Sequence, residues 1–132
     1  MTDHTDLLHQ SMPLCAHLGF RARTFTPAEV EIEVDWSPEL CTSATLLHGG
    51  TVMALADSAG AALAFANLPD GASGTSTIES KTNFLGGVTG GVVRATARLL
   101  HAGSSTLVIE TEVTNNDRLV AKTTQTQAVL RA

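Results

Sequence analysis

One carboxylate stands alone in an apolar stretch of the chain. Asp57 is the only charged residue between Glu39 and Asp70, and small or aliphatic residues such as Ala56 and Ala59 surround it. Burial of a carboxylate without a partner costs several kcal/mol, so a chain rarely keeps one in such a place without a use. We interpret Asp57 as a nucleophile or general base. The alternative is an aspartate on the solvent-facing stripe of a helix.

A glycine pair precedes this carboxylate. His48, Gly49 and Gly50 lie at the expected start of the helix that carries Asp57. Glycines there let a ligand approach bare backbone N–H groups, and the helix dipole favours negative charge at the same place. These are the requirements of an oxyanion hole, which stabilises charge that develops on a carbonyl oxygen. By itself the motif is weak and is also typical of an ordinary helix cap.

The spacing of these two features restricts how they can work together. Gly49 and Asp57 are eight residues apart, which is about 12 Å along a helix axis. An aspartate side chain is too short to bridge that distance. If both residues act on one carbonyl group, Gly49 of one subunit must face Asp57 of another, so the site would require a dimer.

The elements that position these residues follow from periodicity. An Ala- and Leu-rich segment over residues 50–66 has no proline and is apolar nearly all round, which predicts a buried helix. Residues 3–11 predict a short helix, with a second turn from Pro13 to His17. From Val30 to Trp36 apolar residues alternate with acidic ones, which predicts a half-buried strand with Glu31, Glu33 and Asp35 on its polar face.

Further strands are expected near residues 20–25 and over 73–85, 91–102, 105–115 and 119–130. The links between the last four are short, so we expect antiparallel pairing, with the segment from Gly86 to Gly91 as a hairpin turn. The fold class is therefore α+β, with an antiparallel sheet wrapped around one long central helix in a single domain over residues 1–132. The open sheet edges make sheet-to-sheet dimerisation plausible.

Composition limits the function classes. The chain has 132 residues, of which 43% are hydrophobic and 16% charged, with a net charge of −5. This charge argues against nucleic-acid binding. The five histidines lack metal-ligand spacing, so no metal or cofactor is expected, and Cys15 and Cys41 read as small buried thiols. No signal peptide or convincing membrane span is present, so we expect a cytoplasmic protein.

Two segments resemble a known family. The runs from His48 to Ala59 and from Ile78 to Leu85 resemble the hotdog-fold acyl-CoA thioesterases, and the phenylacetate-degradation (PaaI-type) branch is the most similar. The resemblance covers roughly residues 12–130. It implies a hotdog fold and hydrolysis of a small aliphatic or aromatic acyl-CoA to the free acid and CoA. It also implies a homodimer that shares its active sites, often paired into a dimer of dimers.

The resemblance also implies roles for individual residues. Asp57 takes the place of the catalytic carboxylate, Gly49 with Gly50 supplies the amide that polarises the carbonyl, and His48 shapes the loop. Ser76 falls where relatives orient water, and Thr42 stands where many relatives carry Asn or Gln. The segments that contact the CoA arm in relatives correspond to Asn83, Phe84, Leu85, Gly86, His101, Gly103, Ser104, Ser105 and Thr106.

Two other functions stay open. Thr42 has no amide, and Gly86 and Gly87 stand where many relatives have Arg or Pro. A non-catalytic acyl-CoA-binding protein is therefore the first alternative. The second is an enoyl-CoA or 3-hydroxyacyl-CoA hydratase, which would use a histidine and an acid together, although the spacing of His48 and Asp57 suits it poorly.

Overall fold

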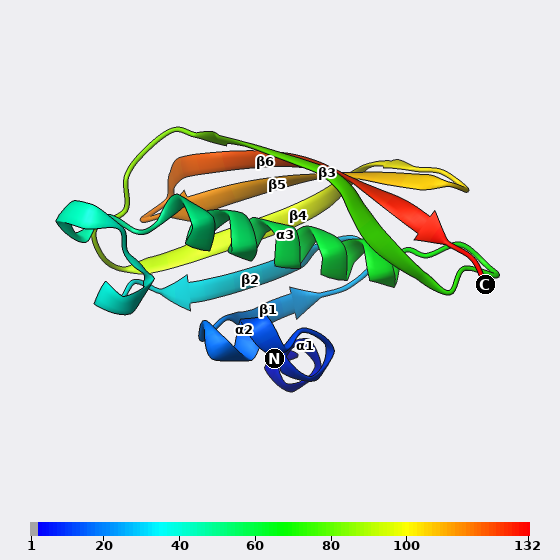
Figure 1. Cartoon of the computed structure of the whole chain (residues 1–132), viewed down its shortest axis with the longest axis horizontal. Coiled ribbons are helices and arrows are strands. Elements are labelled where there is room, and N and C mark those ends of the chain that lie inside the picture. The colour runs from blue at the N-terminus through cyan, green and yellow to red at the C-terminus, as the bar shows by residue number, and fades with distance from the viewer. Residues whose placement is uncertain (1–2) are drawn as a thin grey trace.

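A long helix, α3 (Gly49–Ala66), lies across one face of a six-stranded antiparallel sheet (Figure 1). The computed structural model describes residues 3–132. The chain begins with two short helices, continues with two strands and two single 3₁₀ turns, and ends with four strands after α3. These elements are α1 (Thr5–Ser11), α2 (Pro13–His17), β1 (Arg21–Phe25), β2 (Val30–Asp35), Pro38–Leu40, Ser43–Thr45, β3 (Gly74–Phe84), β4 (Val92–Ala102), β5 (Thr106–Asn115) and β6 (Arg118–Leu130).

The helix α3 is the centre of the core, as the sequence predicts. It contacts every strand from β2 to β6, and half of its eighteen residues are buried. Most of the buried ones are Ala, Gly or Leu, and the small side chains let the sheet approach the helix closely. Among residues 3–132 it is the one helix that is long and apolar enough to cross a bilayer, but here it packs against the sheet. The expected sheet around one central helix is confirmed, whereas a single domain over residues 1–132 stays a prediction.

The strand order corrects one expectation. The sheet runs β1-β2-β4-β5-β6-β3, so β3 pairs with β6 and not with β4. The segment from Gly86 to Gly91 is therefore a crossover and not a hairpin turn. Three inter-strand steps span roughly 14 Å, and an extended link of this length reaches about 20 Å, so a short connection does not force neighbouring strands to pair. β3 becomes an edge strand, and most of its residues are exposed.

The polar face of β2 corrects a second expectation. Glu33 was expected to face solvent, but only 3% of its surface is exposed. Arg21 from β1 and Arg94 from β4 lie against it and cover it from both sides. The alternation gave the correct face of the strand, but the long arginine side chains of neighbouring strands exclude water from it.

Candidate functional site

Asp57 lies in the middle of α3. Its side chain is partly buried and is directed to the strands β3 and β6. Its Oδ1 atom accepts a hydrogen bond from Thr77 Oγ1 at 3.1 Å and one from Gln125 Nε2 at 3.2 Å. For Oδ2, the structure of residues 3–132 contains no hydrogen bond. The carboxylate is thus held by one oxygen, and its second oxygen is available to another molecule.

The two predicted amide donors, in the first turn of α3, differ in their hydrogen bonding. His48 precedes the helix as its N-cap, and its Nδ1 atom accepts the Gly50 N–H at 2.7 Å. The Gly49 N–H has no hydrogen-bond acceptor within residues 3–132. The His48 ring therefore occupies the Gly50 N–H and leaves the Gly49 N–H as the amide that can receive a ligand.

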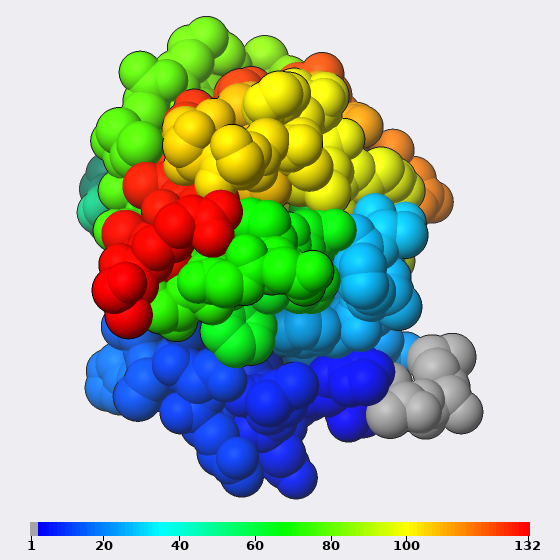
Figure 2. Space-filling view, turned by 90° about the vertical axis from the view of Figure 1, so that its right-hand side faces the viewer, coloured from blue at the N-terminus to red at the C-terminus, as the bar shows by residue number. Residues whose placement is uncertain are grey.

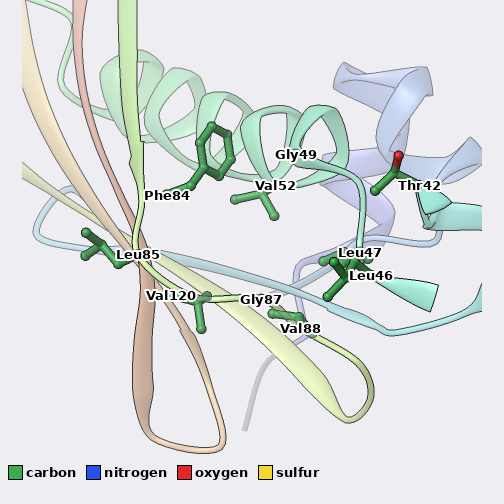
Figure 3. A pocket seen from close by; sticks show the side chains of 11 residues that line it. Thr42, Leu46, Leu47, Gly49, Val52, Phe84, Leu85, Gly87, Val88 and Val120 are labelled. Atoms are coloured by element: carbon green, nitrogen blue, oxygen red, sulfur yellow. The ribbon is translucent and has the colours of Figure 1, made fainter. Parts of the chain in front are cut away.

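A pocket of about 470 Å³ opens beside this amide (Figure 3). It brings together residues from the loop before α3, from the start of α3 and from the end of β3. Its lining is mainly apolar and consists of Thr42, Leu46, Leu47, Gly49, Val52, Phe84, Leu85, Gly86, Gly87, Val88 and Val120. The Phe84 ring lies over Gly49 and leaves little room for a side chain there, since a Cβ on Gly49 would be 3.3 Å from the ring. We call this cavity the Gly49 pocket.

A second pocket, of about 300 Å³, lies on the far side of Asp57. It is bounded by α1 and the loop after it, by β1, by the second half of α3 and by the start of β3. Its lining residues are Leu8, Ser11, Met12, Phe25, Ala61, Ala62, Phe65 and Thr75. Ala61 is one helical turn beyond Asp57 and shares its face of the helix. Figure 2 views the molecule from this end, where the N-terminal helices lie against the residues around the end of α3. We call this cavity the Ala61 pocket.

The predicted CoA-contacting residues fall into two groups in one chain. Asn83 to Gly86 lie at the end of β3 and lead to the start of β4, whereas His101 to Thr106 form the turn at the other end of β4. A strand of eleven residues spans roughly 35 Å. One protomer therefore does not bring the two groups together. Ser76, the predicted water-orienting residue, is exposed on β3, and its neighbour Thr77 is the residue that contacts Asp57.

Three residues near these pockets were missed by the sequence reasoning. Thr77 and Gln125 bind Asp57 from 20 and 68 positions away. Arg118 donates from Nη2 to the Gly87 carbonyl at 2.6 Å and lies against Gly86 at the rim of the Gly49 pocket. A polar Gln at an inward position of β6 is a signal that periodicity could have found. Nothing in the local sequence indicates the position of Arg118.

Other reactive side chains do not assemble into a site. Within residues 3–132, no cluster of three or more His, Cys, Asp or Glu side chains is arranged to hold a metal ion. Cys15 is buried and its Sγ atom lies 3.3 Å from Ser58 Oγ. Burial raises the pKa of the Cys15 thiol, which outweighs the opposite effect of the Ser58 hydrogen bond. Cys15 is thus a structural thiol.

Comparison with known proteins gives a consistent family. Residues 45–122, more than half of the chain, match the family model described as the thioesterase superfamily. A candidate esterase of Mycobacterium tuberculosis strain H37Rv, Rv1847, is 29% identical over 118 residues, which are 87% of this chain and 84% of that protein. The solved structure of Rv1847/MT1895 has a TM-score of 0.88 at 26% identity and covers 92% of this chain and 98% of that one.

Two further solved structures extend the comparison. A candidate thioesterase from Ralstonia eutropha JMP134, described as related to phenylacetic acid degradation, has a TM-score of 0.82 at 26% identity, with 93% and 96% coverage. A mutant thioesterase from Pseudomonas aeruginosa, PA1618, has a TM-score of 0.89 at 24% identity, covers 100% of this chain and 97% of that one, and shows the fold. Together with the helix-wrapped sheet, these matches establish that the chain belongs to the thioesterase superfamily, in its hotdog-fold family, and they support a hydrolase.

Proposed function

We propose that the protein is an acyl-CoA thioesterase that hydrolyses a small, apolar acyl-CoA to the free acid and CoA. The observation that carries this proposal is the Gly49 N–H, which begins a helix, has no acceptor in the described chain and lines a mainly apolar pocket. In such surroundings an amide stabilises the negative charge that develops on a thioester carbonyl oxygen during attack.

Asp57 supplies the second part of the chemistry. In one route its carboxylate attacks the carbonyl carbon, the C–S bond breaks with release of the CoA thiolate, and water then cleaves the resulting anhydride. In the other route Asp57 removes a proton from water, and the hydroxide attacks the carbonyl before the same C–S bond breaks. Both routes consume one water molecule, release one acid and one thiol, and return Asp57 to its starting form.

The site is completed by a second copy of the chain. Thr77 contacts Asp57 and Phe84 covers Gly49, and these β3 residues are seven positions apart, about 23 Å along one strand. β3 is an exposed edge that can pair with itself in antiparallel fashion. If Ser80 pairs with Ser80 of a second copy, Thr77 lies near that copy's Asn83 and Phe84. Because the bulge between Thr77 and Glu79 removes one step along β3, the offset from Phe84 is about two residues, roughly 7 Å along the strands.

Charge favours this register. With Ser80 at the two-fold axis, Glu79 lies opposite Lys81 of the second copy, and the symmetry repeats the pair. Both side chains are exposed in one chain. Opposite charges directly across an antiparallel pair stabilise it, whereas a shift of one residue would place Lys81 opposite Lys81. We therefore propose a homodimer through β3, with each Asp57 facing the partner's Gly49 pocket.

The Ala61 pocket supports an apolar acyl group. It begins one helical turn from Asp57 and is lined mainly by apolar side chains, and its volume of about 300 Å³ is at the small end for ligand sites. An alkyl chain of moderate length or an aromatic ring matches this lining. Replacement of Ala61 by Leu should lower kcat/KM at least tenfold for such groups while acetyl-CoA, which is too short to reach the pocket, is unaffected.

Arg118 supports CoA as the carrier of the acyl group. Its guanidinium lies at the rim of the Gly49 pocket and forms no ion pair with an acidic side chain within residues 3–132. CoA carries phosphate groups that an arginine can bind, whereas a pantetheine thioester does not. The second predicted group, His101 to Thr106, would reach this arm from another protomer, as in a dimer of dimers. In Arg118→Gln, KM should increase for acyl-CoA and remain constant for the matching pantetheine thioester.

A thiol-trapping assay over a panel of acyl-CoA substrates tests the function. We expect thiol release by the parent protein and a rate at least about 100-fold lower, but still measurable, in Asp57→Asn. Binding of acyl-CoA without thiol release would instead indicate a non-catalytic binding protein. Hydration of crotonyl-CoA would indicate a hydratase. The dimer is tested by hydrodynamic mass, because an active monomer contradicts a shared site.

A further inference from the structure

Both hydrogen bonds of Asp57 end on the same oxygen atom. Thr77 from β3 and Gln125 from β6 donate to Oδ1 at 3.1 and 3.2 Å, so the two strands hold this oxygen from adjacent positions. Two donors on one oxygen restrict rotation of the carboxylate group. The other oxygen, Oδ2, is then presented in a fixed direction.

The Gln125 amide has only one favourable orientation. Its side chain is completely buried and Nε2 donates to Asp57, whereas Oε1 has no hydrogen-bond partner among residues 3–132. A buried acceptor without a partner costs about 1–3 kcal/mol. Rotation of the amide would place Oε1 against the Asp57 carboxylate, which is worse. The favoured orientation of the Gln125 amide is therefore the one in which Nε2 donates to Asp57 and Oε1 is left without a partner.

Gly60 makes this orientation possible. It lies on α3 one turn from Asp57, and a Cβ atom on it would overlap Oε1 of Gln125. Even an alanine at this position would force the Gln125 amide away. The contact with Gln125 therefore explains why a glycine stands in the middle of α3, although glycine lowers helix stability by about 1 kcal/mol.

A third residue determines the direction of the Thr77 hydroxyl. Gln127 is buried on β6 and its Nε2 atom donates to Thr77 Oγ1, while its Oε1 atom accepts from Thr75 Oγ1 at 3.0 Å. Because Thr77 Oγ1 accepts from Gln127, its own proton points to Asp57. The chain of donors runs from Thr75 through Gln127 and Thr77 to the carboxylate.

From these contacts we propose that Gln125 and the Gln127–Thr77 pair are positioning residues that hold Oδ1 of Asp57, so that Oδ2 is the oxygen that reacts. The inference rests on the proposed function, because it assigns a role to groups that support the catalytic carboxylate. None of these residues needs to touch the substrate. Their effect is on the orientation of Asp57 and thus on the rate of the chemical step.

The test compares variants that remove one donor each. Thr77→Val and Gln125→Met keep approximate side-chain size but lose the hydrogen bond, and Gly60→Ala displaces Gln125 without altering it. We expect kcat to fall 10- to 100-fold in each, with KM within twofold of the parent. Thr77→Ser, which keeps the hydroxyl, should restore most of kcat. The matched control is Thr82→Val, because Thr82 is also on β3 but its hydroxyl bonds Thr123 instead.

A double-mutant cycle separates positioning from a merely structural role. In an Asp57→Asn background, Thr77→Val should no longer lower the residual rate, whereas a structural effect would persist. The inference is overturned if Thr77→Val and Gln125→Met keep kcat within twofold of the parent, or if Thr82→Val lowers kcat as much as they do. A parent protein without thiol release would refute the proposed function itself. That result differs from an active parent whose Thr77→Val and Gln125→Met variants are equally active, which would refute only the positioning role.

Discussion

Two carboxylates in this fold have opposite surroundings. Glu33 on β2 uses both oxygens, because Oε1 contacts Arg21 at 3.1 Å and Arg23 at 3.4 Å, and Oε2 contacts Arg94 at 3.0 Å. Asp57 on α3 has two neutral donors on Oδ1. Across residues 3–132, no salt bridge reaches Asp57 and no hydrogen bond reaches Oδ2.

The difference separates a structural carboxylate from a reactive one. Burial would raise the pKa of Glu33, but the hydrogen bonds and charges of Arg21 and Arg94 outweigh it, so the pKa lies below its ordinary value. Its charge is neutralised and both oxygens are occupied, so it links three strands and has no capacity for chemistry. Asp57 keeps one oxygen for a substrate, and no cationic side chain within residues 3–132 pairs with it.

The largest effect on kcat is expected from a substitution at Asp57. Asp57→Asn should lower kcat by about 100- to 10,000-fold, because it removes the nucleophile or base. The asparagine keeps an oxygen for Thr77 and Gln125, so the free energy of unfolding should change by less than about 1 kcal/mol. Thiol release and thermal unfolding measure the two quantities. Normal turnover in this variant would exclude Asp57 from the mechanism.

The corresponding change at Glu33 should have the reverse outcome. Glu33→Gln leaves three arginines without their shared negative charge, so the free energy of unfolding should fall by about 2–3 kcal/mol, less than for a fully buried pair because the arginines are partly exposed. The value of kcat should stay within twofold. Urea unfolding and the thiol assay test this pair of expectations, and a large loss of kcat at full stability would contradict the comparison.

The pH dependence of stability sharpens the role of Glu33. Its pKa is lowered in the folded state, so its stabilising effect is complete above the unfolded value of about 4.5 and is lost as the pH falls through the folded value. The parent protein should therefore lose stability in this acidic range, and Glu33→Gln should lose less. Urea midpoints measured from pH 6 to pH 3 test the difference, and parallel curves would show that Glu33 does not contribute.

The smallest expected effects are the losses of stability when single arginines around Glu33 are replaced. Arg94 alone contacts Oε2, whereas Arg21 shares Oε1 with Arg23. Arg94→Gln should therefore destabilise by about 1–2 kcal/mol and Arg21→Gln by about 0.5–1 kcal/mol, since a second arginine remains on Oε1. Chemical unfolding of both variants checks the order. The reverse order would mean that the contacts of Arg21 with Oε1 of Glu33 and with Asp35 together contribute more than the Arg94 contact.

Much of the local structure could be predicted because it depends on neighbouring residues. The alternation from Val30 onward indicated β2, and the apolar run after Gly50 indicated α3, whose bounds agree within one residue. The isolation of Asp57 among apolar residues was also visible in the sequence. These features arise from periodicity and backbone preference, which act over a few residues.

The remaining features could not be predicted because they join distant segments. The expected hairpin between β3 and β4 was wrong, because β3 pairs with β6. The length of the link alone did not distinguish a hairpin turn from a crossover. Ser76 was named from the family resemblance, and its neighbour Thr77 was missed because its contact with Asp57 joins residues 20 positions apart. The amide of Gly50 looked equivalent to that of Gly49 until the His48 ring was placed.

The amino-acid order alone determined the elements of this protein, the lone acid in its central helix and the glycine pair at the start of that helix. The tertiary structure decided which oxygen of Asp57 is held, which amide stays available and why Glu33 is inert. Hydrophobic period and backbone propensity are properties of a short segment. Hydrogen bonds such as that between Gln125 and Asp57 depend on where separate strands come to lie, and only the packed sheet defines that position.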